Sequence, residues 1–257
     1  MTKYVKATIS NRFVEITQQS NLPILNTSYS RGRKLSTNHN SEQYYTNVKK
    51  SINRARKQIR RLLECNFTDE YAFVTLTFKS TDEFDTTNIK ICNKKFSEFK
   101  KRLDYYLQKH GKPKFKYLGV VEFQNKNRNG AIHYHLVCNL INITTKTLEE
   151  LWSYGWVHIE YTKSDAIENE KIANYLKKGI NDPRLNGMKK YFHSHGLKSP
   201  ITLEINNLEE FYNTLAKCKS TLLEGDTYHS SFLGETKYEN YYVDNAKELM
   251  EHVQDLR

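Results

Sequence analysis

Two histidines one residue apart are the residues of this sequence best suited to chemistry. His133 and His135 lie inside an apolar run, and side chains on a strand alternate between its faces, so both imidazoles would project to the same side. Glu122 precedes His133 by eleven residues, across the polar stretch NKNRNG, which is typical of a hairpin loop. If the two strands pair, a carboxylate and two imidazoles come together and can bind a divalent cation.

A pair of this kind can also arise by accident, because the chain has nine histidines. His193 and His195 form a second such pair, but neither apolar alternation nor a nearby carboxylate accompanies them, so we interpret them as loop residues. The alternative interpretation of His133 and His135 is two polar strand residues that bind nothing. Spacing alone does not decide between this alternative and a metal site.

A tyrosine and a lysine on a later segment could complete a reaction centre. The segment from Ser164 to Gly179 has a capping residue at its start and a glycine at its end, which predicts a helix. Tyr175 and Lys178 are three residues apart and so share one helix face. The phenol has an ordinary pKa of about 10, and an ammonium group beside it lowers the cost of forming the nucleophilic phenolate. Lys177 could take this role if the helix phase differs slightly.

Taken in order, these segments resemble the motifs of the HUH endonucleases, in particular the rolling-circle replication initiators of small phages and plasmids. The three motifs are FVTLTF at 73–78, HYH at 133–135 and IANYLKK at 172–178. The further stretches that look like this group are the basic run at 54–61 leading to Asn66, VEFQ at 121–124, WSYGWVHI at 152–159 and the segment 190–200. The resemblance spans roughly residues 50–205.

The resemblance implies an enzyme that nicks and rejoins single-stranded DNA. It implies that His133 and His135 bind Mg²⁺ or Mn²⁺, with Glu122 as the third ligand. It also implies that Tyr175 attacks the scissile phosphate to form a 5′-phosphotyrosine, while Lys178 steadies the phosphate or the tyrosine. Some relatives carry two tyrosines one helical turn apart. Here the positions one turn before and after Tyr175 hold other residue types, so we expect a single-tyrosine enzyme.

The charge balance favours a polyanionic partner, since Lys and Arg number 40 against 29 Asp and Glu and give a net charge of +11. Much of this charge lies on a predicted helix at 49–61, with one face for packing and the other for backbone phosphates. The apolar positions at helical spacing are Tyr45, Val48, Ile52, Ile59, Leu62 and Leu63. The residues expected to contact DNA are Arg54, Arg56, Lys57, Arg60 and Arg61. A basic helix that is merely solvated is the alternative.

Composition narrows the cellular setting and the partners. A mean hydropathy of −0.76 predicts no bilayer-spanning stretch, and we expect no secretory signal. The four cysteines form no CxxC spacing, so we expect a reducing cytoplasm, that of a bacterial host. The chain has no GxxxxGK[ST] phosphate loop, so unwinding would need a separate helicase, with the host polymerase following. The sequence leaves the oligomeric state open.

The order of predicted elements indicates an α+β fold with a central antiparallel sheet and helices packed on one face. The resemblance likewise implies an HUH nuclease with a ferredoxin-like or RRM-like core. The predicted elements are strand 71–79, helix 87–110, the hairpin of 115–123 with 131–140, helix 144–152, strand 156–161 and helix 164–179.

Three parts of the chain are expected. Residues 1–40 form an N-terminal extension whose turn-rich end, 28–41, is a flexible join, and residues 41–205 form the nuclease core with its basic helix. Residues 206–257 form a C-terminal extension with a helix at 207–224, then aromatic strand-like sequence and a last helix.

Two other functions compete with replication initiation. An HUH transposase or conjugative relaxase would share the chemistry but act on different DNA, and the basic helix and the YFHS segment at 191–194 favour the replication class. A noncatalytic DNA-binding regulator of replication would keep the fold without the reaction.

Overall fold

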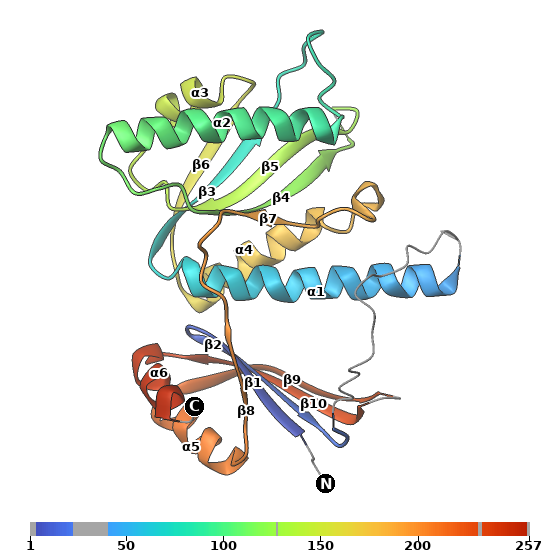
Figure 1. Cartoon of the computed structure of the whole chain (residues 1–257), viewed down its shortest axis with the longest axis vertical. Coiled ribbons are helices and arrows are strands. Elements are labelled where there is room, and N and C mark those ends of the chain that lie inside the picture. Colours follow the sequence, from blue (N-terminus) through green and yellow to red (C-terminus); the bar gives the residue numbers. More distant parts are fainter. Residues whose placement is uncertain (1–3, 23–40, 127, 231–232, 256–257) are drawn as a thin grey trace. The chain divides into compact units, whose positions relative to one another are not determined.

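The computed structural model describes residues 4–22, 41–126, 128–230 and 233–255, and the chain divides into two compact units (Figure 1). One unit is residues 41–198, and the other combines residues 1–40 with 199–257. Each is built on a five-stranded antiparallel sheet. The terminal segments, which sequence reasoning treated as separate extensions, contribute strands to one sheet. The expected join at 28–41 lies, up to residue 40, outside the described residues.

The unit of residues 41–198 carries the sheet β6-β3-β5-β4-β7. Its elements in chain order are α1 Glu42–Asn66, β3 Glu70–Thr77, α2 Ile89–Lys109, β4 Tyr117–Gln124, β5 Ala131–Cys138, α3 Thr145–Trp152, β6 Val157–Lys163, α4 Ala166–Gly179, η1 Pro183–Leu185 and β7 Phe192–His193. The predicted α+β class is confirmed, and each predicted element of this unit is present with shifted ends.

Helices cover both faces of this sheet, so the expectation of helices on one face only is wrong (Figure 1). The α2 and α3 helices pack on one face around Tyr134, Phe99 and Trp152, all of which are fully buried. On the other face α1 and α4 bury Ile59 and Leu176 against the sheet. Because β5 is central and covered on both sides, every one of its residues is buried, and the hydrophobic effect contributes about 1.5–3 kcal/mol for each large apolar side chain.

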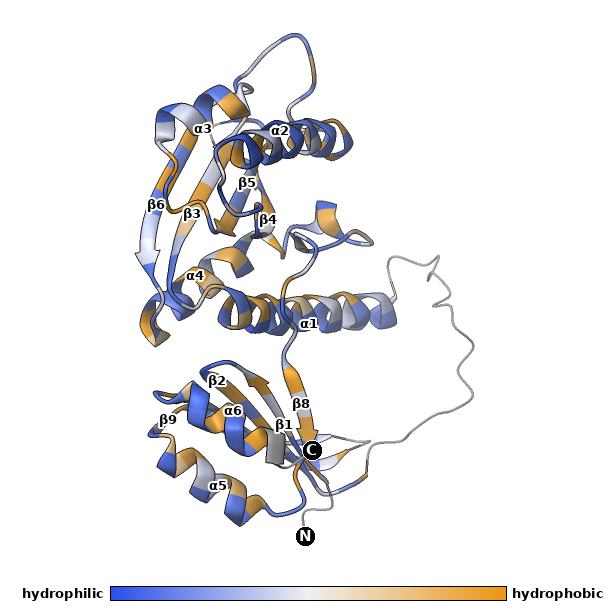
Figure 2. Ribbon diagram, turned by 60° about the vertical axis from the view of Figure 1, so that its left-hand side comes forward, coloured by the Kyte–Doolittle hydropathy of each residue, from blue (hydrophilic) through white to orange (hydrophobic). Residues whose placement is uncertain are grey.

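The α1 helix shows how sequence sets both the ends and the faces of an element. Ser41 caps its start by accepting a hydrogen bond from the Tyr44 backbone N–H. Hydrophobic and hydrophilic residues alternate along α1 and α2 at helical spacing (Figure 2), and the apolar stripe of α1 faces the sheet. The predicted apolar position Tyr45 is an exception, because it is exposed.

The second unit carries the sheet β8-β1-β2-β10-β9, with α5 and α6 packed on it. Its elements are β1 Tyr4–Ser10, β2 Phe13–Gln19, β8 Ile201–Glu204, α5 Leu208–Lys217, β9 Ser220–Ser230, β10 Gly234–Val243 and α6 Ala246–Asp255. The predicted helix at 207–224 is too long. The chain turns at Lys219, which has a φ of 55°, and then pairs with β10, so cross-strand pairing overrides the helical pattern there. Among the described residues no helix combines the length and apolar content needed to cross a membrane.

Candidate active site

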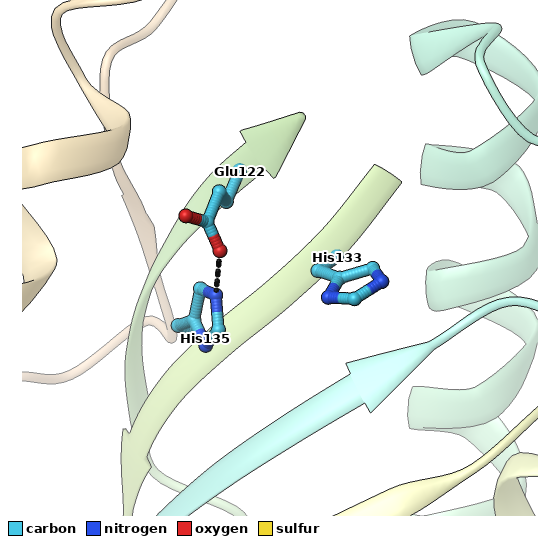
Figure 3. A group of neighbouring side chains, drawn as sticks. All are labelled: Glu122, His133 and His135. Carbon is cyan, nitrogen blue, oxygen red and sulfur yellow. Dashed lines mark hydrogen bonds and ion pairs between the residues drawn. The ribbon is translucent and has the colours of Figure 1, made fainter. Parts of the chain in front are cut away.

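Glu122, His133 and His135, here called the triad, lie together on paired strands β4 and β5 (Figure 3). Glu122 stands opposite His133 in the register, and His135 is two residues further along β5 on the same face. Tyr134, between the histidines, points to the opposite face, where its ring stacks on Phe96. One potential ligand atom from each triad residue lies within 4.8 Å of the others, which is the arrangement that a shared cation requires.

Hydrogen bonds fix the orientation of two triad side chains. The Nε2 of His135 lies 2.6 Å from a Glu122 carboxylate oxygen, and its Nδ1 lies 3.0 Å from the Thr75 hydroxyl (Figure 3). The Gln124 amide donates to the same Glu122 oxygen at 3.1 Å. Such outer contacts set the ring orientation and the tautomer of a ligating histidine. Thr75 and Gln124 were not among the predicted site residues, because nothing in their spacing signals a supporting role.

The protonation states of the triad suit metal binding at neutral pH. Burial lowers the pKa of His133 to about 4, with a further contribution from His135. The hydrogen bond from His135 lowers the pKa of Glu122 and so favours the carboxylate. Within the described residues the buried His133 Nε2 has no hydrogen-bond partner. A neutral imidazole nitrogen left without a partner beside a carboxylate fits a cation as its missing partner, because a buried polar atom without one is costly.

Tyr175 projects from α4 toward the triad. Asp165 caps α4 by accepting from the Glu168 backbone N–H, and burial of Leu176 holds the helix against the sheet. The Tyr175 ring meets the His135 ring edge-on at 5.1 Å between centroids and the Phe73 ring at 5.3 Å. Burial raises the pKa of Tyr175, as do the charges of Glu122 and Glu160, so the phenol carries its proton at neutral pH. The side chain is nevertheless 40% exposed and thus open to a substrate.

The two lysines that follow Tyr175 have different surroundings. The Lys178 ammonium lies 5.6 Å from the centroid of the Tyr175 ring, whereas the Lys177 ammonium donates to the Asn174 side chain at 3.2 Å. Of the two, Lys178 is therefore the better placed to act beside the phenol.

The close approach of α4 to β4 depends on Gly179. A Cβ at this position would lie 2.7 Å from the Val121 carbonyl oxygen, closer than such atoms approach in proteins. The glycine thus ends the helix and lets it pack directly on the strand that carries Glu122.

The predicted DNA-binding residues of α1 separate into two groups. Arg54, Lys57 and Arg61 line a cleft of about 540 Å³ together with Lys189 and Lys190. The latter two were not predicted, although they fall in or beside a segment that resembles the initiators. Five basic side chains and no carboxylate line this cleft, so a chain of phosphates suits it.

Arg56 and Arg60, the other two predicted residues, make contacts within the protein. Arg56 donates to the Asn181 side chain at 3.1 Å, and Arg60 lies 3.8 Å from the buried carboxylate of Glu64. These contacts tie α1 to the end of α4 and to its own next turn, which is a structural role.

The second histidine pair does not form a comparable site. His193 and His195 are exposed, and the His193 Nδ1 contacts the Ser194 carbonyl oxygen at 2.8 Å. In the part of the chain that the structure describes, the triad is the one group of three or more potential ligands.

Comparison with protein families places these residues in context. Residues 71–180 match a family of replication-associated proteins of the ORF2 type. The resemblance to rolling-circle initiators is therefore confirmed for this segment, which contains the triad, Tyr175 and Lys178 but fewer than half of the 257 residues. The basic residues of α1 lie outside it. No curated protein and no solved structure gives a significant match.

Proposed function

We propose that this protein is a rolling-circle replication initiator that nicks and rejoins single-stranded DNA through Tyr175. One observation carries the proposal: the Tyr175 ring lies against His135 of the triad, within a segment that matches a replication-associated family. A phenol, two imidazoles and a carboxylate from two strands and a helix meet at one point, and a half-exposed nucleophile beside a cation site is suited to phosphoryl transfer.

His133, His135 and Glu122 would hold the cation, Mg²⁺ or Mn²⁺. When bound, it would withdraw charge from the scissile phosphodiester and orient it. Thr75 and Gln124 keep His135 and Glu122 in place for this role through the hydrogen bonds described above.

The reaction of the protein's own residues can be written with all atoms accounted for. The Tyr175 Oη attacks the phosphorus, the bond from phosphorus to the 3′-oxygen breaks, and a 5′-phosphotyrosine and a 3′-hydroxyl result. The phenol loses its proton and the leaving oxygen gains one. Lys178 lies beside the ring and would stabilise the phenolate or the transferring phosphate. Reversal of the step rejoins the strand without ATP, because the covalent link conserves the bond energy.

The basic cleft of α1 supports the binding half of this function. Arg54, Lys57 and Arg61 are three and four residues apart on α1, so they lie along one helix face over about 10 Å. This length spans about three phosphates of a stacked strand. We infer that this cleft holds DNA next to the nick site, at a replication origin.

The remaining parts of the proposal concern the setting. We propose that the protein acts in the cytoplasm of a bacterial host and depends on the host helicase and polymerase. Transposases and relaxases of the same chemistry would act on other DNA, and a noncatalytic regulator would bind the origin without cutting it.

A cleavage assay tests the proposal. A single-stranded oligonucleotide carrying the origin of the protein's own replicon, labelled at its 3′ end, is incubated with the protein and Mn²⁺. We expect a labelled covalent adduct on a denaturing gel. Tyr175→Phe should lose the adduct and retain binding. An adduct from Tyr175→Phe would overturn the assignment of the nucleophile, and binding without any adduct from the unaltered protein would favour the regulator.

A further inference from the structure

A hollow of about 480 Å³ lies at the end of β3, apart from the triad. Three aromatic residues line it, namely Phe84, Tyr154 and Trp156, and Lys79 supplies a cation. The hydroxyl-bearing residues of the lining are Ser80, Thr81 and Ser153. Together they combine apolar ring surface, hydrogen-bonding groups and one positive charge. This hollow is called the aromatic pocket below.

Trp156 is unusually open to solvent for an indole. It is 80% exposed, whereas the nearby Trp152 is fully buried and donates to the Thr77 carbonyl oxygen at 2.7 Å. Large aromatic side chains are usually well buried, so an exposed indole on the rim of a pocket points to a ligand that covers it. The segment 152–159 resembles the initiators, yet nothing in the proposed nicking step uses it.

The strand register links this pocket to the triad. Glu122 pairs with His133, and His133 pairs with Thr77 of β3. Thr77 in turn exchanges hydrogen bonds with Trp156, at 2.9 Å from its own N–H to the Trp156 carbonyl oxygen and 3.1 Å from the Trp156 N–H to the Thr77 hydroxyl. Neighbouring strands are about 4.8 Å apart, so the backbone of Trp156 lies about 10 Å from that of His133. A stacked strand covers this distance in about three nucleotides.

The pocket is rigid before any ligand arrives. A Cβ at Gly155 would lie 2.2 Å from the Thr77 carbonyl oxygen, so only glycine lets the loop rest on β3. The Tyr154 hydroxyl donates to Glu98 at 2.5 Å, and the Arg102 guanidinium lies 5.1 Å from the Tyr154 ring centroid. A preformed site loses little entropy on binding, which is what a recognition pocket needs.

We propose that the aromatic pocket binds a nucleobase of the DNA strand whose phosphate is cut at the triad, a few nucleotides from the nick. Trp156 stacks on the base, and Lys79 pairs with a phosphate next to it. An unpaired base presents an apolar face to rings and polar edges to hydroxyl groups, and stacking on aromatic side chains is a common mode of single-strand binding. The identity of the strand rests on the proposed function, whereas the pocket itself does not.

Tryptophan fluorescence tests the pocket without cleavage, since the protein has only two tryptophans. The full chain is titrated, without added metal, with homopolymeric single-stranded oligonucleotides of each base, about a dozen nucleotides long. We expect quenching by at least one homopolymer and protection of the emission from iodide. A duplex of the same length should have neither effect, because its bases are already stacked.

Three variants separate a stacking role from a structural one. Trp156→Ala should weaken binding of the quenching homopolymer by about five- to a hundredfold, the range measured for aromatic stacking on bases. Trp156→Phe keeps a ring, so it should lose the quenching and bind within about tenfold of the unaltered protein. Tyr105→Ala removes another exposed aromatic side chain, on α2, and should change neither quantity.

The outcomes distinguish this inference from the proposed function. An unchanged affinity of Trp156→Ala, or no quenching by any homopolymer, overturns the pocket even if the origin oligonucleotide still forms the tyrosine adduct. Quenching and weaker binding by Trp156→Ala support the pocket even if the adduct never forms, in which case the nicking function fails and a single-strand binding site remains.

Discussion

The phenol ring of Tyr175 stands edge-on to the imidazole of His135, although the two residues belong to a helix and a strand forty positions apart. Phe73 of β3 touches both, because it stacks on His135 at 5.9 Å between centroids and meets Tyr175 edge-on at 5.3 Å. Ring packing, rather than a hydrogen bond between the two, holds the candidate nucleophile at the candidate metal site. The lysine next to this arrangement can be tested first.

Lys178→Ala should slow adduct formation by about ten- to a hundredfold, because it removes the cation beside the Tyr175 ring. Lys177→Ala is the matched control, since the Lys177 ammonium contacts Asn174 instead, and its rate should stay within about threefold. Single-turnover nicking of the origin oligonucleotide measures both rates. The reverse order of effects would show that Lys177 takes the catalytic role.

Loss of either triad histidine should weaken Mn²⁺ binding by at least about tenfold, because replacing even an outer-shell partner of a ligand has effects of this size. His133→Ala and His135→Ala are compared by calorimetric titration with His193→Ala, which alters an exposed histidine outside the triad. The control should bind Mn²⁺ like the unaltered protein. Equal losses in all three variants would contradict the assignment.

Local rules were enough to predict the triad. The two-residue period of a strand placed His133 and His135 on one face, and the polar loop before them indicated the hairpin that brings Glu122 alongside. Both signals lie within a few residues of the side chains concerned. The helix of Tyr175 was predicted for the same reason, from a cap at Asp165 and a glycine at its end.

Contacts between distant segments were beyond these rules. Helical spacing does not tell which arginines of α1 face a protein partner, so Arg56 and Arg60 were grouped with the cleft residues, although their partners are Asn181 and Glu64. Pairing of β2 with β10 joins residues more than 200 positions apart, and neither strand carries a local signal for it. The aromatic pocket was missed because it depends on the resting of Gly155 on β3.

Gly179→Ala should reduce nicking by about a hundredfold, because the added Cβ would lie 2.7 Å from the Val121 oxygen and push α4, with Tyr175, away from the triad. The helix propensity of alanine is about 1 kcal/mol better, so any loss would come from this displacement. Gly225→Ala is the control, since its Cβ would make ordinary contacts at 3.5 Å. Nicking by Gly179→Ala at the unaltered rate would show that α4 need not sit so close.

A buried polar network anchors the start of α4 and gives a prediction at high pH. The Tyr71 hydroxyl donates to the Asn169 side chain at 3.1 Å, and Asn169 donates to Glu64 at 3.0 Å. Burial raises the pKa of Tyr71, and the charges of Glu168 and Glu64 raise it further. The unfolded phenol ionises near pH 10, so the stability that this proton contributes is complete below about pH 10 and is lost as the pH rises further.

Tyr71→Phe should therefore flatten the fall in the free energy of unfolding above about pH 10, because phenylalanine has no proton to retain. Near pH 8 the variant should be less stable by about 1 kcal/mol, the usual contribution of one hydrogen bond. Urea denaturation at a series of pH values measures both effects. Tyr105→Phe, which alters an exposed phenol on α2, is the control and should leave the curve unchanged. If Tyr71→Phe and the unaltered protein lost stability equally at high pH, Tyr71 would not hold its proton through burial in this network.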